Sequence, residues 1–353
     1  MGLPAEFSRK VSVVKNRILF GALPVVLTIL VGLFSLSLAQ KHRTASVTTP
    51  ASTLLTSLPT SDAIVLLKVK RVLDEALPKL LSGNPAKLAE AKAEIEQFKT
   101  RTGIDLRSFD QIAFGMRYTY PSAGITKVNT VAIASGSFST GAIVAAGRMV
   151  ANGKYQEQKY QSKTIYIFTL DQQAKLFGLV DVKVKDLAVC PLDGMTLALG
   201  DLQSVRAAID VVKGRSRANA ELIALASRDP NAIVGFGGNI SRALLENLRI
   251  SNDTIARNLT AVRQVYGTVG LTDKDLELLI AARTVDEYSA KNLSDTIEGL
   301  KQFGALFINR LPAAKGALAR SALGNLKVTT QGNELQIRTA VAQAEIAPLM
   351  QGL

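Results

Sequence analysis

The sequence predicts an α+β protein: two tandem copies of a sheet-plus-helices unit that follow one N-terminal transmembrane helix. Three observations lead to this fold class. Residues 18–39 carry no charge, strand and helix patterns share the rest of the chain, and one order of these patterns occurs twice at an offset of about 170 residues. A repeated order of elements is the sequence signature of a duplicated structural unit.

Residues 18–39 form the predicted membrane anchor. These 22 residues would span ~33 Å as a helix, which matches a hydrocarbon core of ~30 Å. The alternative is a signal peptide, because Ser37, Leu38 and Ala39 ahead of Gln40 fit a cleavage site. The length of the run favours the anchor. Its membrane-spanning residues would include Ile18, Leu19, Phe20, Leu27, Leu30, Leu33, Phe34, Leu38 and Ala39.

The short arm before this run sets the predicted orientation. Residues 1–17 carry four basic residues and one acidic residue, and an excess of Lys and Arg marks the cytoplasmic side. The bulk of the chain is therefore expected on the extracytoplasmic side of an inner (cytoplasmic) membrane. Cleavage after Ala39 would make it periplasmic or secreted instead.

Residues 40–60, QKHRTASVTTPASTLLTSLPT, are predicted to be a flexible linker. They are rich in Ser, Thr, Ala and Pro and show little periodicity. Folded structure is expected to begin near Ser61.

Composition excludes several classes of chemistry. The 353 residues contain one histidine, His42, which lies in the predicted linker. A chain acting alone therefore has no His-based triad, His-ligated zinc or His general base in its folded part. Cys190 is the single cysteine, so no intrachain disulfide is possible, and no cofactor is predicted. The net charge is +13, and the part beyond residue 39 carries 38 basic and 28 acidic residues, or +10. An exported basic surface suggests attraction to anionic lipid or an envelope polymer, but a soluble domain that happens to be basic is the preferred interpretation of the same charge.

The first copy is predicted to occupy residues 61–220. It is expected to contain a strand at 63–69, a helix to 80 that Pro78 kinks or ends early, a helix from Asn84 to Gly103, strands at 112–118 and 128–134, a helix to 150, a strand at 163–169, a hairpin at 187–199 and a helix capped by Asp201.

The second copy is predicted to occupy residues 221–353 and to repeat that order. It is expected to contain a strand at 231–236, a helix at 241–248, a helix capped by Asp253 that runs through Tyr266 to Gly267, a strand at 276–282, a helix at 289–308 and a hairpin of 326–330 with 334–341.

Two stretches resemble ligand motifs without completing them. Gly136 and Gly141 are spaced as in a phosphate loop, but Ala142 and Ile143 stand where Lys and Ser or Thr are needed. Asp273, Asp275 and Glu277 would share one face of a strand, but the glycine and distant glutamate of an EF-type calcium loop are missing. We interpret the first as a turn with a helix cap and the second as a solvated face; no metal site is predicted.

A basic stretch at residues 309–327 is a candidate contact with an anionic surface. It contains Arg310, Lys315, Arg320 and Lys327 and no acidic residue. Its apolar residues are small and include no Trp or Phe, so a linker helix packed on its own sheet explains the same pattern.

One order of residues is familiar. Gly136 and Phe138 lead from a strand into a helix, the strand 165–167 follows, and Asp201 ends a hairpin ahead of the helix that contains residues 205–210. This order resembles uncharacterised exported bacterial proteins that carry an N-terminal membrane anchor and tandem α+β repeats. The resemblance implies an exported two-repeat fold, and it implies no activity and no functional residue.

The leading hypothesis is a non-enzymatic, membrane-anchored envelope protein whose extracytoplasmic domain binds a partner or ligand. The first alternative is a carrier of lipids or other hydrophobic molecules, which requires an apolar cavity. The second is a His-independent hydrolase, which requires two carboxylates, or a Ser–Lys pair, converging in a cleft with opposed pKa shifts. The membrane is the expected partner, nucleic acid is not, and no protein partner is indicated.

Overall fold

A computed structural model describes residues 51–122, 125–176, 180–215, 217–247, 253–308 and 313–346. The predicted arm, the anchor from Ile18 to Ala39 and the first part of the linker lie outside the described residues, as does Arg310. Among the helices that are described, none combines the length and the hydropathy needed to cross a bilayer.

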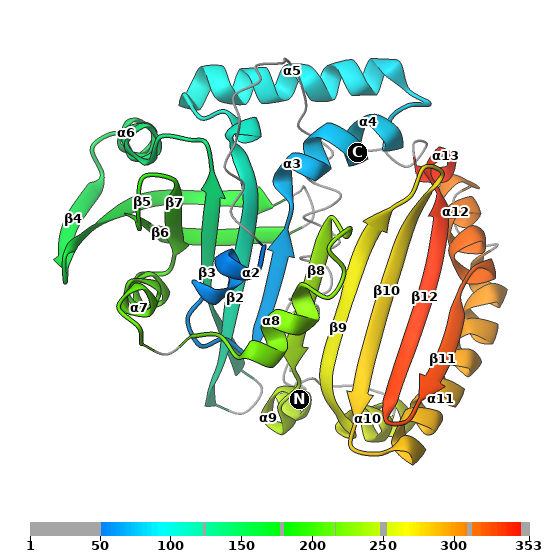
Figure 1. Ribbon diagram of the computed structural model, residues 1–353. Helices are drawn as coiled ribbons and strands as arrows, with labels where there is room; N and C mark the ends of the chain where they lie inside the picture. The colour runs from blue at the N-terminus through cyan, green and yellow to red at the C-terminus, as the bar shows by residue number, and fades with distance from the viewer. Residues whose placement is uncertain are drawn as a thin grey trace, which may run out of the picture.

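One antiparallel sheet of twelve strands organises the molecule (Figure 1). The strand order is β11-β12-β10-β9-β8-β1-β2-β3-β7-β6-β5-β4. The strands are β1 (Ala63–Leu67), β2 (Phe109–Ser122), β3 (Ile125–Gly136), β4 (Tyr155–Tyr160), β5 (Lys163–Leu176), β6 (Val180–Pro191), β7 (Thr196–Gly200), β8 (Val234–Asn239), β9 (Val262–Leu271), β10 (Asp275–Thr284), β11 (Lys327–Gln331) and β12 (Glu334–Ala342). The coarse prediction, an α+β protein with paired strands and helices, is confirmed.

The sheet is centred on the pair β1–β8, which joins segments about 170 residues apart. Val65 lies opposite Phe236 in the middle of this pair. On one side the strands follow as β2, β3, β7 and β6, and on the other as β9, β10, β12 and β11. Strands β4 and β5 extend the first side only.

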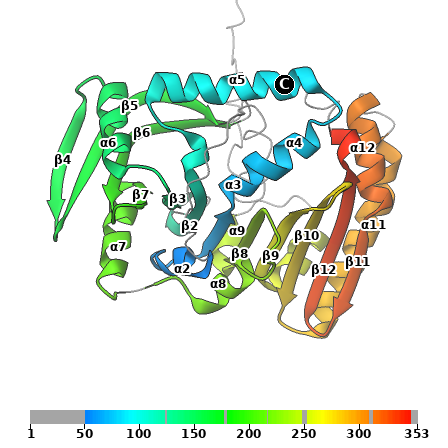
Figure 2. The ribbon, with the colours of Figure 1, turned by 45° about the horizontal axis from the view of Figure 1, so that its top comes forward.

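Helices cover both faces of the sheet (Figures 1 and 2). Ile64 and Leu66 pack with α2, α7 and α8 on one face, whereas Ala63, Val65 and Leu67 pack with α3, η1, α4 and α5 on the other. Because successive residues of a strand point to opposite faces, β1 is buried on both sides. The helices are α2 (Ala51–Thr56), α3 (Val69–Arg71), η1 (Val72–Ala76), α4 (Leu77–Leu80), α5 (Pro85–Thr102), η2 (Leu106–Ser108), α6 (Thr140–Val150), α7 (Leu202–Val212), α8 (Ala220–Ala226), α9 (Arg242–Asn247), α10 (Asp253–Thr260), α11 (Glu287–Phe307), α12 (Ala313–Gly324) and α13 (Gln343–Ile346).

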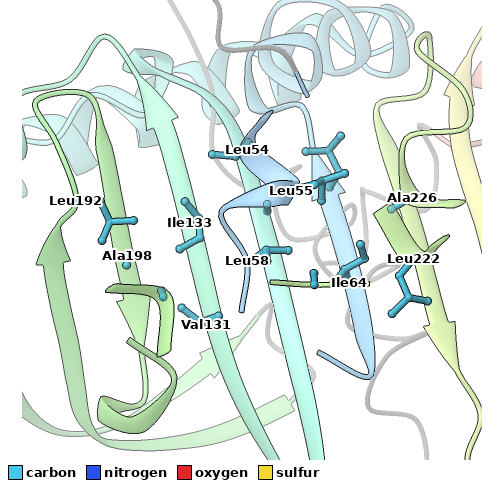
Figure 3. Packing of buried hydrophobic residues seen from close by; sticks show 14 of the residues in the cluster. Leu54, Leu55, Leu58, Ile64, Val131, Ile133, Leu192, Ala198, Leu222 and Ala226 are labelled. Carbon is cyan, nitrogen blue, oxygen red and sulfur yellow. The ribbon is translucent and has the colours of Figure 1, made fainter. Parts of the chain in front are cut away.

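The folded part begins earlier than predicted. Residues 51–60 were expected to belong to the flexible linker, but they form α2 and the turn that leads to β1. Leu54, Leu55 and Leu58 are buried against Ile64 on the sheet (Figure 3). Leu54 and Leu55 belong to α2 and Leu58 to the turn that follows it, and the polar residues around these leucines concealed the apolar contact in the sequence.

The helix predicted from Asp253 to Gly267 is too long. Helix α10 ends at Thr260 and β9 begins at Val262. Tyr266 is fully buried in the strand. Gly267 is required there for a different reason than a helix cap: a Cβ would lie 2.2 Å from the Leu279 carbonyl oxygen. The β-branched and aromatic residues of 262–271 favour a strand and outweigh the helical spacing.

Other local predictions are confirmed. Asn84 caps α5 by accepting from the Lys87 amide, and Gly103 ends that helix in the left-handed region. Asp201 caps α7 by accepting from the Ser204 amide at 2.9 Å. The helical stretch runs through a π-helical turn at 72–76 and on to Leu80, so it continues past Pro78. Proline has no amide hydrogen to donate, and the π-helical turn just before it marks the departure from regular α-helical hydrogen bonding.

Candidate functional site

An open cavity of about 710 Å³ lies where the end of α8 meets the sheet. Nine of its ten lining residues are polar or charged, the exception being Val285. They come from α8 and the turn after it, from the start of β9, from the end of β10 and from the β11–β12 hairpin: Glu221, Arg228, Arg263, Gln264, Arg283, Thr284, Val285, Gln331, Asn333 and Glu334. We call this cavity the arginine pocket after Arg228, Arg263 and Arg283.

A β-bulge directs one of the three arginines. Arg283 pairs with Gln264, while the next residue, Thr284, pairs with Val262. Arg263 is therefore an extra residue in β9, and bulges of this kind turn side chains away from the regular alternation. Its Nη1 donates to the Thr260 carbonyl at 2.8 Å and to the Val262 carbonyl at 3.3 Å, which holds the guanidinium at the strand end.

The other two arginines are held by Tyr266. The guanidinium carbons of Arg228 and Arg283 lie 5.1 Å and 5.5 Å from the centre of the Tyr266 ring. Arg228 also donates from Nη1 to the Tyr266 hydroxyl. Burial, followed by the Glu334 carboxylate, raises the pKa of Tyr266 to about 12. The phenol therefore stays neutral and anchors both cations by stacking.

Two glutamates fix the position of Arg283. Its Nε donates to Glu334 Oε2 at 3.1 Å, and its Nη1 donates to Glu221 Oε1 at 3.0 Å and to Gln264 Oε1 at 3.3 Å. Burial acts to raise the pKa of Glu334, but donors on Tyr266, Gln336 and Arg283 together hold that pKa below its usual value. Glu334 is thus an ionised acceptor within a hydrogen-bond network.

A second, smaller cavity of about 280 Å³ lies at the C-terminal end of β1, beside the π-helical turn. Its lining is also charged: Lys68, Lys70, Arg71, Asp74, Glu75, Asp110 and Gln111. Burial raises the pKa of Asp74, whereas a hydrogen bond from Arg71 lowers the pKa of Glu75. These are the opposed shifts expected of an acid–base pair.

The geometry of that pair is unfavourable for catalysis. Arg71 holds Glu75 by two hydrogen bonds, from Nε to Oε1 at 3.0 Å and from Nη2 to Oε2 at 2.7 Å. Asp74 and Glu75 are adjacent in a helix, where consecutive side chains diverge. Across the described ranges, no group of three or more His, Cys, Asp or Glu side chains is placed to hold a metal ion.

The residues predicted to contact an anionic surface are described only in part. Arg310 lies outside the described residues, and for Lys315 only the backbone, in α12, is described. Arg320 is exposed on α12 and Lys327 is exposed at the start of β11. Neither Arg320 nor Lys327 lines either cavity.

The remaining sequence candidates take structural roles. Ser139 after Gly136 caps α6 by accepting from the Ala142 amide at 3.3 Å. Asp273 lies in the turn before β10 and pairs with Lys79 at 2.8 Å. Cys190 is fully buried in the core.

Sequence reasoning missed the arginine pocket altogether. Arg228, Arg263 and Arg283 are far apart in the sequence and belong to no motif. The bulge that directs Arg263 depends on strand pairing, so no local pattern announces it.

Neither the protein-family models nor the curated proteins contain a match to this chain. Solved structures of a protein named TP0453 have a similar backbone path. Its crystal forms III, IV and I give TM-scores of 0.43, 0.42 and 0.40 at 9%, 8% and 8% sequence identity. They cover 85%, 84% and 87% of this chain, and 98%, 95% and 98% of theirs. Similarity at this level carries no inference about what this protein binds.

Proposed function

We propose that this protein is a non-enzymatic, membrane-anchored envelope protein whose α+β domain binds a ligand or partner in the arginine pocket. The observation that carries the proposal is the fixed geometry of that pocket. Arg228 and Arg283 are stacked on Tyr266, and Arg263 is tied to two backbone carbonyls. Side chains that are ordered before binding lose less entropy when a ligand arrives.

The anchor assigns the place of this domain. Residues 18–39 hold the chain in the inner membrane, with the arm of residues 1–17 in the cytoplasm and the sheet on the extracytoplasmic side. If cleavage occurs after Ala39, the same domain is periplasmic or secreted. Either arrangement presents the arginine pocket to anionic lipid or to an envelope polymer.

The two sides of the sheet are, in this proposal, two copies of one unit. Support comes from the common strand order and from backbone hydrogen bonds outside the regular pairing that occur in matched pairs. Asp62 N–H donates to the Met116 carbonyl as Ile233 N–H does to the Val269 carbonyl, and Lys68 N–H donates to Ile233 as Asn239 N–H does to Asp62. Gly136 N–H donates to Met195 as Thr284 N–H does to Asn333, and Ser137 N–H donates to Ser108 as Val285 N–H does to Ala261. The first strands of the two copies, β1 and β8, correspond to each other at an offset of about 170 residues.

The bulge is also matched. In β2, Phe109 pairs with Gly136 and Gln111 with Ser135, so Asp110 is the extra residue. In β9, Arg263 is the extra residue. The extra residue is charged in both places, but only the second is an arginine beside two others. In this proposal the two copies share one strand arrangement and one bulge position, and the arginine pocket belongs to the second copy.

The test is capture of envelope material by the full chain. We expect wild-type protein to fractionate with the inner membrane and, at low salt, to retain a component that the Arg263→Ala variant loses. Arg242→Ala is the matched control, because Arg242 lies on α9 outside the pocket and its side chain is 88% exposed. A protein that retains nothing at low salt, or retains the same material in all three forms, contradicts the proposal.

The hydrolase alternative has one observation in its favour, the opposed pKa shifts of Asp74 and Glu75. It requires that Asp74→Asn abolish a hydrolytic activity of the full chain. The carrier alternative requires an apolar cavity. The two cavities described above are instead lined by charged and polar side chains.

A further inference from the structure

We infer that the arginine pocket binds a singly charged oxyanion, the phosphodiester group of a hydrophilic ligand. This inference rests on the proposed function, since it names the ligand of the same pocket. The pocket shows which donors would hold the group, how much charge it would carry and what the rest of the ligand would meet.

Arg228 and Arg263 supply the donors. Among the described residues, Arg228 contacts Tyr266 and Glu334 through Nη1, at 3.9 Å from Glu334 Oε1. Arg263 uses Nη1 for its two carbonyl contacts. Within the described part of the chain, the Nε and Nη2 groups of both side chains have no hydrogen-bond partner, so they remain available to a ligand. A guanidinium presents such N–H groups in a rigid fork that matches the spacing of phosphate oxygens.

Arg283 plays a different role. Its Nε and Nη1 are directed to Glu334, Glu221 and Gln264. It therefore neutralises carboxylates that would otherwise repel an anion. The three arginines and two glutamates that line the pocket leave a charge of +1. A ligand group with one negative charge balances the pocket, whereas a dianion leaves an excess negative charge close to the two glutamates.

The rest of the lining indicates a hydrophilic ligand. Gln331 and Asn333 are exposed on the β11–β12 hairpin, and their amides can donate to and accept from hydroxyl groups. Val285 is the single apolar residue of the lining. A phosphodiester between polyol groups fits this surface, and it occurs both in phospholipid headgroups and in phosphate-containing polymers.

The test is calorimetric titration of the full chain, in an uncharged detergent, with glycerophosphoglycerol. This soluble phosphodiester carries one negative charge and four hydroxyls. Glycerol 3-phosphate supplies a dianion and acetate a carboxylate for comparison, and vesicles of phosphatidylglycerol supply the same phosphodiester on a lipid. The variants are Arg263→Ala, Arg228→Ala and the control Arg242→Ala, each first shown to unfold at a temperature close to that of wild type.

We expect glycerophosphoglycerol to bind more tightly than glycerol 3-phosphate or acetate. Loss of one charge-assisted hydrogen-bond donor should weaken binding at least about tenfold in Arg263→Ala, with Arg242→Ala unchanged. Arg263→Lys should recover only part of the affinity, because lysine keeps the charge and loses the fork. Binding to vesicles alone, with the same dependence on Arg263, would support the inference and assign the phosphodiester to a lipid.

Equal binding of acetate or of the dianion would overturn the inference, as would binding that Arg228→Ala and Arg263→Ala both leave unchanged. The proposed function fails separately. If capture of envelope material depends on Arg263 while no phosphodiester binds, the ligand class is wrong and the pocket stands. If capture also ignores Arg263, the proposed function falls.

Discussion

Alanine in place of Gly235 should loosen α8 from the sheet and thereby disturb the arginine pocket. Gly235 lies on β8 directly beneath the end of α8. A Cβ at this position would lie 2.0 Å from the Ala226 carbonyl oxygen and 3.0 Å from the Ala226 carbonyl carbon. Both atoms belong to the backbone, so no change of side-chain rotamer relieves the contact. The end of α8 must move, and Arg228 lies two residues beyond it.

The expected loss of stability is about 1–3 kcal/mol, the usual cost of forcing an extra methyl group into a packed core. Gly299→Ala is the matched control. Gly299 lies within α11, and a Cβ there would have no atom within 4 Å. Alanine at that half-buried but unobstructed helical position should instead stabilise the protein by about 0.5–1 kcal/mol, because it favours the helix over the flexible unfolded chain.

The measurement is denaturant unfolding of the full chain followed by circular dichroism, with both variants compared with wild type. Gly235→Ala should also weaken any Arg263-dependent capture of envelope material, while Gly299→Ala should not. The reasoning would be refuted if Gly235→Ala unfolded within about 0.5 kcal/mol of wild type, or if both glycine variants lost stability equally.

Three further predictions concern other parts of the fold. Leu55→Ala should cost about 2–5 kcal/mol in the same unfolding assay, because Leu55 is fully buried; exposed Thr53→Ala should change it by less than about 0.5 kcal/mol, and equal small effects would mean that α2 is not part of the core. Burial raises the pKa of Cys190 to about 11, so iodoacetamide should alkylate the native protein at pH 8 about a hundredfold more slowly than the unfolded chain; equal rates would contradict burial. The pKa of Glu334 is lowered on folding, so its contribution is present above its unfolded value of 4.5 and is lost as the pH falls through the folded value. Stability measured against pH should therefore show Glu334→Gln less stable than wild type at pH 7 and the gap closing below pH 4.5; a gap that stays constant would argue against the network.

Local signals predicted much of the fold. Asn84, Asp201 and Gly103 act at helix ends within a few residues of their partners, so their roles could be inferred from sequence alone. Tyr266 could not be placed, because its helical spacing from Val262 competed with strand propensity. Pairing of β9 with β8 and β10 decided the outcome, and such pairing is invisible to a local pattern.

The candidate site depended still more on long-range structure. Arg228 follows α8, Arg263 is the extra residue of a bulge and Arg283 lies near the end of β10. Only the folded sheet brings Arg228 and Arg283 to Tyr266 and places Arg263 in the same pocket lining. Of the basic stretch that the sequence singled out, Arg320 lies on α12 and Lys327 on β11, and neither lines the arginine pocket.

Hydrogen–deuterium exchange of the full chain, with and without extracted envelope material, tests binding in the arginine pocket most directly. The account predicts slower exchange at residues 261–264 and 331–334, and no such slowing in Arg263→Ala. Slower exchange confined to residues 68–75 around the smaller cavity, or none at all, would contradict it.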